Sequence, residues 1–226
     1  QGPITGISTG SQARYCVTQY NTVGGFSSTG ASLVQGIISS AYDTPIIVRN
    51  KVFNLSCDNA NGTVVGVASD NGVARILSNR IGDLRTPSAN NSNAIIGINL
   101  LTGIDFGIVA YNTVYINATS SGSIFGSSAV SIVPVTLPSY LVSLNNNVLI
   151  NKSTANGGGL SVAHRRTTTD LSTFDTASNK NLFFASTIFS DGVNTDATLA
   201  AYKTRMANGV RESICFVEDP TFLSTI

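Results

Sequence analysis

Charged side chains are scarce in this chain. Its 226 residues include 13 Lys and Arg and 12 Asp and Glu, so charged residues make up 11 % of the sequence, against roughly 25 % in an average soluble domain. A net charge of +1 and the lack of a basic cluster beyond Arg165-Arg166 exclude a surface that follows nucleic-acid phosphates. No segment approaches the ~18 consecutive apolar residues of a membrane span. We therefore expect no nucleic-acid partner and no transmembrane segment.

Cysteine is also rare. Cys16, Cys57 and Cys215 give neither a disulfide framework nor a metal-ligand spacing such as C-x-x-C. Buried thiols, or one disulfide with one free thiol, are both compatible with the sequence. We expect no metal and no cofactor. Gln1 leads directly into polar sequence, so a signal peptide is absent or already removed.

Uncharged polar residues supply the missing polarity. Ser, Thr, Asn and Gly number 28, 24, 22 and 21, a composition that is common on extracellular surfaces. Hydrophobic residues still make up 42 % of the chain, which is more than a disordered segment would carry. The chain is therefore expected to fold around a continuous core.

A three-residue motif recurs along the chain. It consists of Asn, or Lys in one degenerate copy, followed by a polar and then an aliphatic residue, and its copies are spaced by 29, 29, 33, 34 and 34 residues. The constant polar and aliphatic positions indicate side chains that alternate between solvent and core. The copies are Asn21-Thr22-Val23, Asn50-Lys51-Val52, Asn79-Arg80-Ile81, Asn112-Thr113-Val114, Asn146-Asn147-Val148 and Lys180-Asn181-Leu182.

Each period contains short strands separated by turn-forming residues. In the second period, strands are predicted over 52–55, 63–68 and 73–77, with a polar loop at 56–62 and a turn at Asp70-Asn71-Gly72. Helical periodicity is missing before about Asp196, so the crossover helices of a doubly wound sheet are missing too. These features predict an all-β protein, a right-handed parallel β-helix or solenoid, with coils over residues 1–195.

Stacking of the coils explains the repeated Asn. Equivalent residues of neighbouring parallel coils lie one strand spacing apart, roughly 4.8 Å, so each Asn amide is expected to bond the amides above and below it. Asn also tolerates the left-handed backbone of a turn. The simpler alternative is that Asn is merely frequent in turns. The predicted structural ladder consists of Asn21, Asn50, Asn79, Asn112 and Asn146.

The last residues differ from the coils. Positions 196–206 place Leu199, Tyr202 and Met206 on one helical face, with Thr195 or Asp196 as the N-cap. Asn208-Gly209 is expected to end this helix, and residues 213–217 are expected to form a strand. Because a solenoid needs a cover for its last coil, residues 196–226 are predicted to be a helix-plus-strand cap within one continuous domain.

Two segments resemble a known family. They are the coil Tyr111-Asn112-Thr113-Val114-Tyr115-Ile116-Asn117-Ala118 and the ending Ala201-Tyr202-Lys203…Arg211-Glu212-Ser213…Glu218-Asp219-Pro220-Thr221-Phe222. Both resemble the right-handed parallel β-helix regions of large surface proteins that Bacteroidota export by the type IX secretion system. The resemblance extends from about Val17 to Phe222. It implies a secreted or cell-surface, adhesin-like or glycan-associated module, and it supplies no catalytic residues. The family's C-terminal sorting domain is missing, which implies a fragment or a processed piece.

Parallel β-helices also carry polysaccharide lyases and hydrolases. Such chemistry needs two or three carboxylates, or carboxylates with Arg or Lys, on one face. Asp43, Asp70 and Asp105 precede three ladder Asn residues by 7, 9 and 7 residues, which predicts a column across three coils. That column is the candidate for catalysis or for Ca²⁺ binding. The alternative is ordinary turn chemistry.

A second polar concentration is His164-Arg165-Arg166 with Asp170 and Asp175. Two Arg beside a His are suited to bind an anionic sugar. The alternative is a solvated loop beside the Gly157-Gly158-Gly159 turn.

An outward aromatic row is the candidate for ligand binding. Because the second residue after each ladder Asn is expected to point inward, the third should point outward, which would expose Phe53, Tyr115 and Phe183 on one sheet. Flat rings beside Asn and Thr are suited to stack against neutral sugars. In the alternative, long polar loops fold back and cover the row.

Three functions follow from these features. The first is a non-enzymatic secreted or cell-surface module that presents or spaces a binding surface for glycans or other cell-surface proteins. The second is a polysaccharide lyase or glycoside hydrolase that uses the acidic column. The third is a self-assembling structural subunit, which the low net charge and an open first coil favour.

The ladder register is testable by three substitutions. Asn79→Ala should lower the free energy of unfolding by roughly 1–3 kcal/mol, because it leaves buried donors and acceptors unmatched. Ile81→Ala should cost about 2–5 kcal/mol as a core cavity. Arg80→Ala, the solvated control, should change stability by no more than about 0.5 kcal/mol. Denaturant melts measure all three, and a dominant effect of Arg80→Ala would place the register off by one residue.

Overall fold

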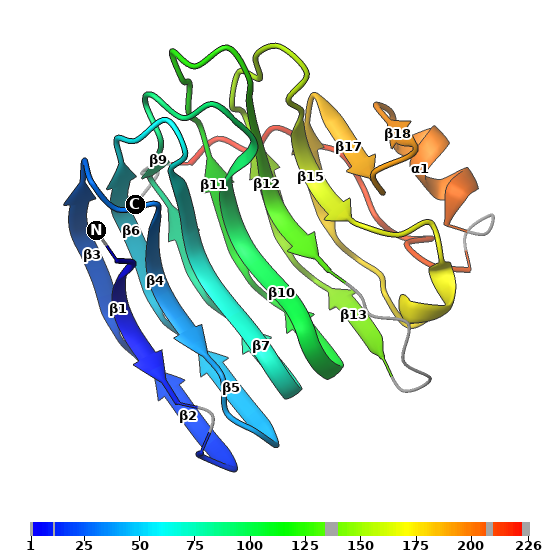
Figure 1. The fold of residues 1–226 in the computed structure, drawn as a ribbon. Coiled ribbons are helices and arrows are strands. Elements are labelled where there is room, and N and C mark those ends of the chain that lie inside the picture. The colour runs from blue at the N-terminus through cyan, green and yellow to red at the C-terminus, as the bar shows by residue number, and fades with distance from the viewer. Residues whose placement is uncertain (1, 11, 134–139, 207–209, 223–226) are drawn as a thin grey trace.

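The computed structural model describes residues 2–10, 12–133, 140–206 and 210–222. The chain winds into a parallel β-solenoid of stacked coils (Figure 1), which confirms the predicted all-β parallel β-helix. Cys16, Cys57 and Cys215 are free thiols. Within the described ranges, the solenoid contains no helix with the length and apolar character needed to cross a membrane.

Two sheets, here called A and B, run along the solenoid. Sheet A has 11 strands and sheet B has 7. Sheet A consists of β1 (Ile4–Thr9), β2 (Tyr15–Gln19), β4 (Leu33–Ser39), β5 (Thr44–Val48), β7 (Thr63–Leu77), β10 (Asn91–Ala110), β12 (Phe125–Ile132), β13 (Leu141–Asn145), β15 (Ser161–Arg166), β17 (Thr187–Ser190) and β18 (Thr195–Asp196). Sheet B consists of β3 (Thr22–Ser28), β6 (Lys51–Cys57), β8 (Arg80–Gly82), β9 (Leu84–Arg85), β11 (Thr113–Ile116), β14 (Val148–Asn151) and β16 (Leu182–Ala185).

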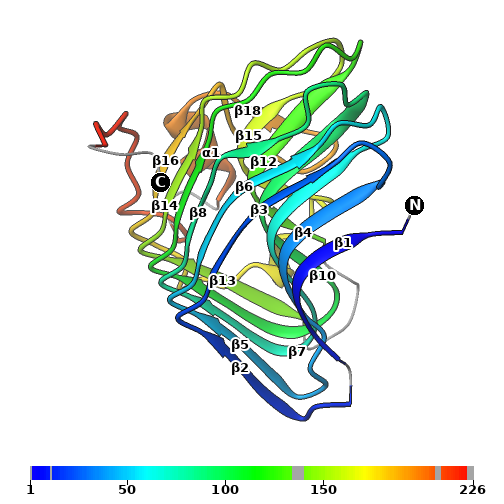
Figure 2. The same ribbon diagram turned by 90° about the vertical axis from the view of Figure 1, so that its left-hand side faces the viewer.

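Strands β7 and β10 are longer than the sequence predicts. β7 covers the predicted strands at 63–68 and 73–77 and the expected turn between them. Gly72 has a φ of +61°, so the backbone changes direction here without leaving the sheet. Figure 2 shows these long strands bending, so that one strand contributes to two sides of a coil.

A ladder of Asn side chains joins the coils at the corner between sheets A and B. Asn79 Nδ2 donates to Asn112 Oδ1 (3.0 Å) and to Ile47 O (2.9 Å), and the Asn79 N–H also donates to Asn112 Oδ1 (2.9 Å). The other rungs repeat this arrangement, so every ladder amide donates toward the C-terminal coils. The rungs are Asn21, Asn50, Asn79, Asn112, Asn147 and Asn181.

The fifth rung is one residue later than predicted. Asn147, not Asn146, accepts from Asn112 Nδ2 (3.0 Å) and is 1 % exposed. Asn146 instead turns the corner with a φ of +54°. The residue before every rung has this left-handed backbone, so the ladder Asn itself is not the turning residue as predicted. The turning residues, with φ between 54° and 60°, are Tyr20, Arg49, Ser78, Tyr111, Asn146 and Lys180.

Small residues let sheets A and B approach each other. A Cβ atom at Gly66 would collide with the Ile81 side chain, and one at Gly97 would collide with Val114. Ile81 and Val114 are both 0 % exposed. The aliphatic position of the motif therefore points into the core, as predicted, and packs against a column of small residues on sheet A.

The helix α1 (Leu199–Arg205) lies at the C-terminal end (Figure 1). Its N-cap is Thr198, whose Oγ1 accepts from Ala201 N (3.2 Å), rather than Thr195 or Asp196. Tyr202 is fully buried, as the predicted apolar face requires. A 3₁₀ helix at Leu171–Thr173 precedes this region.

The predicted strand at 213–217 does not form. The segment makes one isolated parallel bridge, from Phe216 to Leu182, because its backbone is held by turns next to it. Asn208-Gly209, expected to end the helix, lies outside the described residues. The cap over the last coil is therefore a helix followed by an irregular segment.

Glu212 ends the Asn ladder. Its side chain is 0 % exposed, and Oε1 and Oε2 each accept from Asn181 Nδ2 at 2.9 Å. Without this acceptor the last ladder amide would keep a buried donor unsatisfied. Burial raises the pKa of Glu212 to about 8, and the hydrogen bond from Asn181 and the positive charge of Lys203 offset this only in part.

The corrected fifth rung is testable with adjacent residues. Asn147→Ala should lower the free energy of unfolding by roughly 1–3 kcal/mol, because the ladder bonds of two coils lose their partner. Asn146→Gly should be nearly neutral, within about 0.5 kcal/mol, because Gly accepts a left-handed backbone without strain. Urea melts of both variants measure the difference, and equal losses would contradict the assignment.

Glu212 should make stability depend on pH. Its pKa is about 8 in the folded chain and about 4.3 in an unfolded one, so the folded state holds the proton more tightly. The contribution to stability is full below about pH 4 and is lost as the pH rises toward about 8.

Urea melts at several pH values of wild type and Glu212→Gln measure this effect. The stability of wild type should fall relative to the variant by up to about 1.4 kcal/mol per pH unit. Parallel curves for the two proteins would contradict the buried, protonated carboxyl.

Candidate functional site

The aromatic row on sheet B is only partly as predicted. Strand pairing aligns Phe53 with Gly24, and Tyr115 with Gly82 and Ile150, in one outward row. Phe183 is 0 % exposed and belongs to the core. The cause is that the last two copies of the motif are shifted by one residue: their rungs are Asn147 and Asn181, not Asn146 and Lys180. This shift reverses the inward and outward positions counted from those copies. Phe184, paired with Ile150, takes the outward position instead.

The outward rings are already occupied by this chain's own groups. Lys51 Nζ lies 4.7 Å from the ring centroid of Phe53, and Phe222 packs edge-on against Tyr115 at 5.6 Å. Lys152 Nζ pairs with Asp219 Oδ2 at 2.8 Å and so ties the C-terminal segment to the same sheet. Lysines and the C-terminal segment, rather than long loops, therefore cover part of the row and leave Phe53, Tyr115 and Phe184 half-buried, which weakens the case for sugar stacking.

The three carboxylates of the acidic column do not align. Val73 N donates to Asp43 O at 2.7 Å, and Asp105 lies at a bulge between the residues paired with Gly72 and Val73. Asp70 lies earlier on β7, where its Oδ2 accepts from Ser40 Oγ at 3.0 Å. Within the described ranges, no three His, Cys, Asp or Glu side chains gather closely enough to hold a metal ion. The predicted column therefore does not bring its acids together.

The segment His164-Arg165-Arg166 is not a solvated loop but the end of β15. His164 and Arg166 are 0 % and 1 % exposed, so they point into the solenoid. Arg165 points outward, and its Nε donates to Ser128 Oγ at 2.6 Å. The three neighbours therefore cannot bind one external sugar together.

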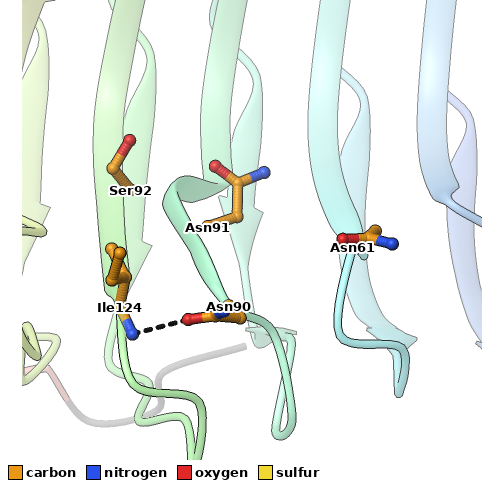
Figure 3. A pocket seen from close by; sticks show the side chains of 5 residues that line it. All are labelled: Asn61, Asn90, Asn91, Ser92 and Ile124. Carbon is orange, nitrogen blue, oxygen red and sulfur yellow. Dashed lines mark hydrogen bonds between the residues drawn. The ribbon is translucent and has the colours of Figure 1, made fainter.

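A polar hollow lies where the loops from sheet B enter sheet A. Its volume is about 350 Å³, and Figure 3 shows that its lining comes from successive coils. Asn90 Oδ1 accepts from Ile124 N (2.8 Å) and from Ser123 Oγ (2.9 Å), which holds two of the loops together. The lining residues are Asn61, Asn90, Asn91, Ser92 and Ile124.

The hollow continues onto the outer face of sheet A through hydrogen-bonded side chains. Asn91 Nδ2 donates to Thr63 Oγ1 at 3.2 Å. Two residues along β10, Asn93 Oδ1 accepts from Ser128 Oγ at 2.6 Å. Ser128 in turn accepts from Arg165, whose pKa burial lowers to about 10. Arg165 therefore stays charged at neutral pH and marks the end of an otherwise uncharged surface.

The side chains that line the hollow are uncharged, and most of them can form hydrogen bonds. Amide and hydroxyl groups surround one aliphatic side chain, Ile124, which is 40 % exposed. The Asn61 side chain and Asn90 Nδ2 form no hydrogen bond with any described residue, so both are available to a ligand. The volume is at the lower end of small-molecule sites.

Comparison with protein-family models, curated proteins and solved structures finds no match to this chain. The hollow is also a feature that the sequence analysis missed. The sequence indicates a polar loop at 56–62, and its interpretation assigns no binding role to Asn61 or Asn90. The sign of the hollow in the sequence is that Asn61 and Asn90 take similar positions in successive coils.

Proposed function

We propose that this solenoid is a non-enzymatic binding module for neutral glycans, and that the hollow around Asn61 and Asn90 is its binding site. The observation that carries the proposal is the lining itself, which combines free amides with an exposed aliphatic side chain and no charged group. Sugar hydroxyls pair well with amides, and the C–H face of a sugar ring packs against an apolar side chain.

The dispersed acids favour binding over catalysis. Glycoside hydrolysis needs two carboxyl groups placed on either side of one bond, and Asp43, Asp70 and Asp105 do not converge. The lyase or hydrolase alternative therefore has no arrangement of residues in its favour.

The location outside the cell is part of the proposal. It rests on the resemblance to surface proteins of the type IX secretion system and on the low charge and high Ser, Thr and Asn content. In that setting the solenoid presents the hollow on a stiff, elongated support, as an adhesin-like module would.

A glycan array followed by calorimetry tests the proposal. Wild type should bind one or more neutral polysaccharides, and Asn61→Ala or Ile124→Ala should weaken binding about tenfold, the effect of losing one hydrogen bond or one apolar contact. Asn117→Ala removes an equally exposed amide outside the hollow and should leave the affinity unchanged. Lack of binding across the array, or equal losses in all three variants, would overturn the proposal.

A further inference from the structure

Polar side chains replace the aliphatic core in one of the last coils. His164 and Arg166 lie on the inward side of β15, paired with Val130 and Ile132 of the preceding coil. They are 0 % and 1 % exposed. Burying a charged guanidinium among core residues costs several kcal/mol unless a partner compensates it.

The compensation within the chain is incomplete. Arg166 Nη2 donates to Asp170 O (2.9 Å) and Thr173 Oγ1 (2.5 Å). Arg166 Nε and Nη1, His164 Nε2 and the Tyr140 hydroxyl are buried and have no hydrogen-bond partner among the described residues. These are four of the seven such side-chain atoms in the described part of the chain.

His164 and Arg166 both contact Phe174, and Tyr140 lies near Arg166. The Phe174 ring centroid lies 5.1 Å from that of His164 and 5.3 Å from Arg166 Cζ. Tyr140 leads into β13, whose Val142 pairs with Phe174. Burial raises the pKa of Tyr140 and lowers that of His164, and the positive charge of Arg166 lowers both. The unpartnered groups therefore belong to one region of the interior.

All the unpartnered groups are donors. The phenol of Tyr202 is a stronger acid than a neutral imidazole, so it donates to His164 Nδ1, 2.8 Å away. This bond places the ring proton on Nε2. Within the described part of the chain, His164 Nε2–H, the Tyr140 hydroxyl, Arg166 Nε–H and the Arg166 Nη1 amino group then lack an acceptor.

One carboxylate, that of Asp170, lies near Arg166 without forming an ion pair with it. Arg166 forms no ion pair with any described carboxylate, and the segments outside the described residues contain no Asp or Glu. The Asp170 carboxylate instead accepts from Ser172 N and Ser172 Oγ, both at 2.8 Å. Burial lowers the pKa of Arg166, and the neighbouring Tyr140, Tyr202 and Asp170 groups offset this effect only in part.

We propose that Tyr140, His164 and Arg166 form an internal binding site for a small monovalent anion of the halide class. The anion accepts the four unpartnered donor groups and neutralises Arg166. A single-atom anion suits a site whose residues are at most 3 % exposed, whereas a bound water would satisfy donors but leave the charge uncompensated. Because the anion binds only the folded chain, it stabilises the last coils.

Bromide and chloride test the site in two ways. Crystals soaked in sodium bromide should show an anomalous peak beside Arg166. In solution, the melting temperature of wild type should rise when chloride replaces gluconate at constant ionic strength. Tyr140→Phe should weaken the apparent chloride affinity about tenfold, the effect of one lost hydrogen bond.

Two adjacent arginines supply the matched control. Arg166→Met restores an aliphatic side chain, as in the preceding coil, and should abolish the chloride dependence of melting. Arg165→Gln changes the outward neighbour and should keep that dependence. A peak explained by water alone, an unchanged melting temperature in chloride, or the same chloride effect in Tyr140→Phe and wild type would overturn the proposal, even if Arg166→Met failed to fold.

Discussion

The Asn ladder is the interaction on which the rest of this solenoid depends. Each amide bonds the next coil through both its side chain and its backbone N–H, and a left-handed residue before it turns the chain toward sheet B. The rungs follow one another at intervals of 29, 29, 33, 35 and 34 residues. The corner stays constant while the loops between the sheets vary. The hollow lies among these variable loops, away from the constant corner.

The ladder has a direction, and the C-terminal end of the solenoid is built around it. Every amide donates toward that end, so the last rung needs an acceptor, and the buried carboxyl group of Glu212 supplies it. The same end holds His164 and Arg166 where earlier coils are aliphatic. Tyr202 of α1 contacts His164 and closes this region. The cap thus covers an interior with a different polarity, and it does so through hydrogen bonds as well as apolar contacts.

The sequence was sufficient for the architecture, because a motif repeated at a nearly constant period reports directly on stacked coils. The sequence-based prediction is wrong where the register of a ladder rung is ambiguous by one residue. Asn146-Asn147-Val148 and Lys180-Asn181-Leu182 fit the motif, but the rungs are the second residues, Asn147 and Asn181. Counting three residues from Lys180 instead of two from Asn181 places Phe183 at the surface. The acids do not align because Asp70 precedes its rung by 9 residues, whereas Asp43 and Asp105 each precede theirs by 7, a position that Gly72 occupies on β7. Aligning the coils by their small inward residues, Gly97, Ala129 and Ala163, would have placed His164 in the core. The hollow could not be predicted, because loop conformation decides which side chains meet there.

Coil stacking also determines how the molecule carries load. The strands lie across the direction in which the coils stack (Figure 1). A pull along that direction therefore acts on the hydrogen bonds of one coil at a time rather than shearing many strands at once. Because each coil contacts only its neighbours, coils can detach in sequence from an end. A detached coil of about 30 residues adds roughly 100 Å of extended chain. Under tension the solenoid would therefore lengthen in steps, and each step would dissipate mechanical energy.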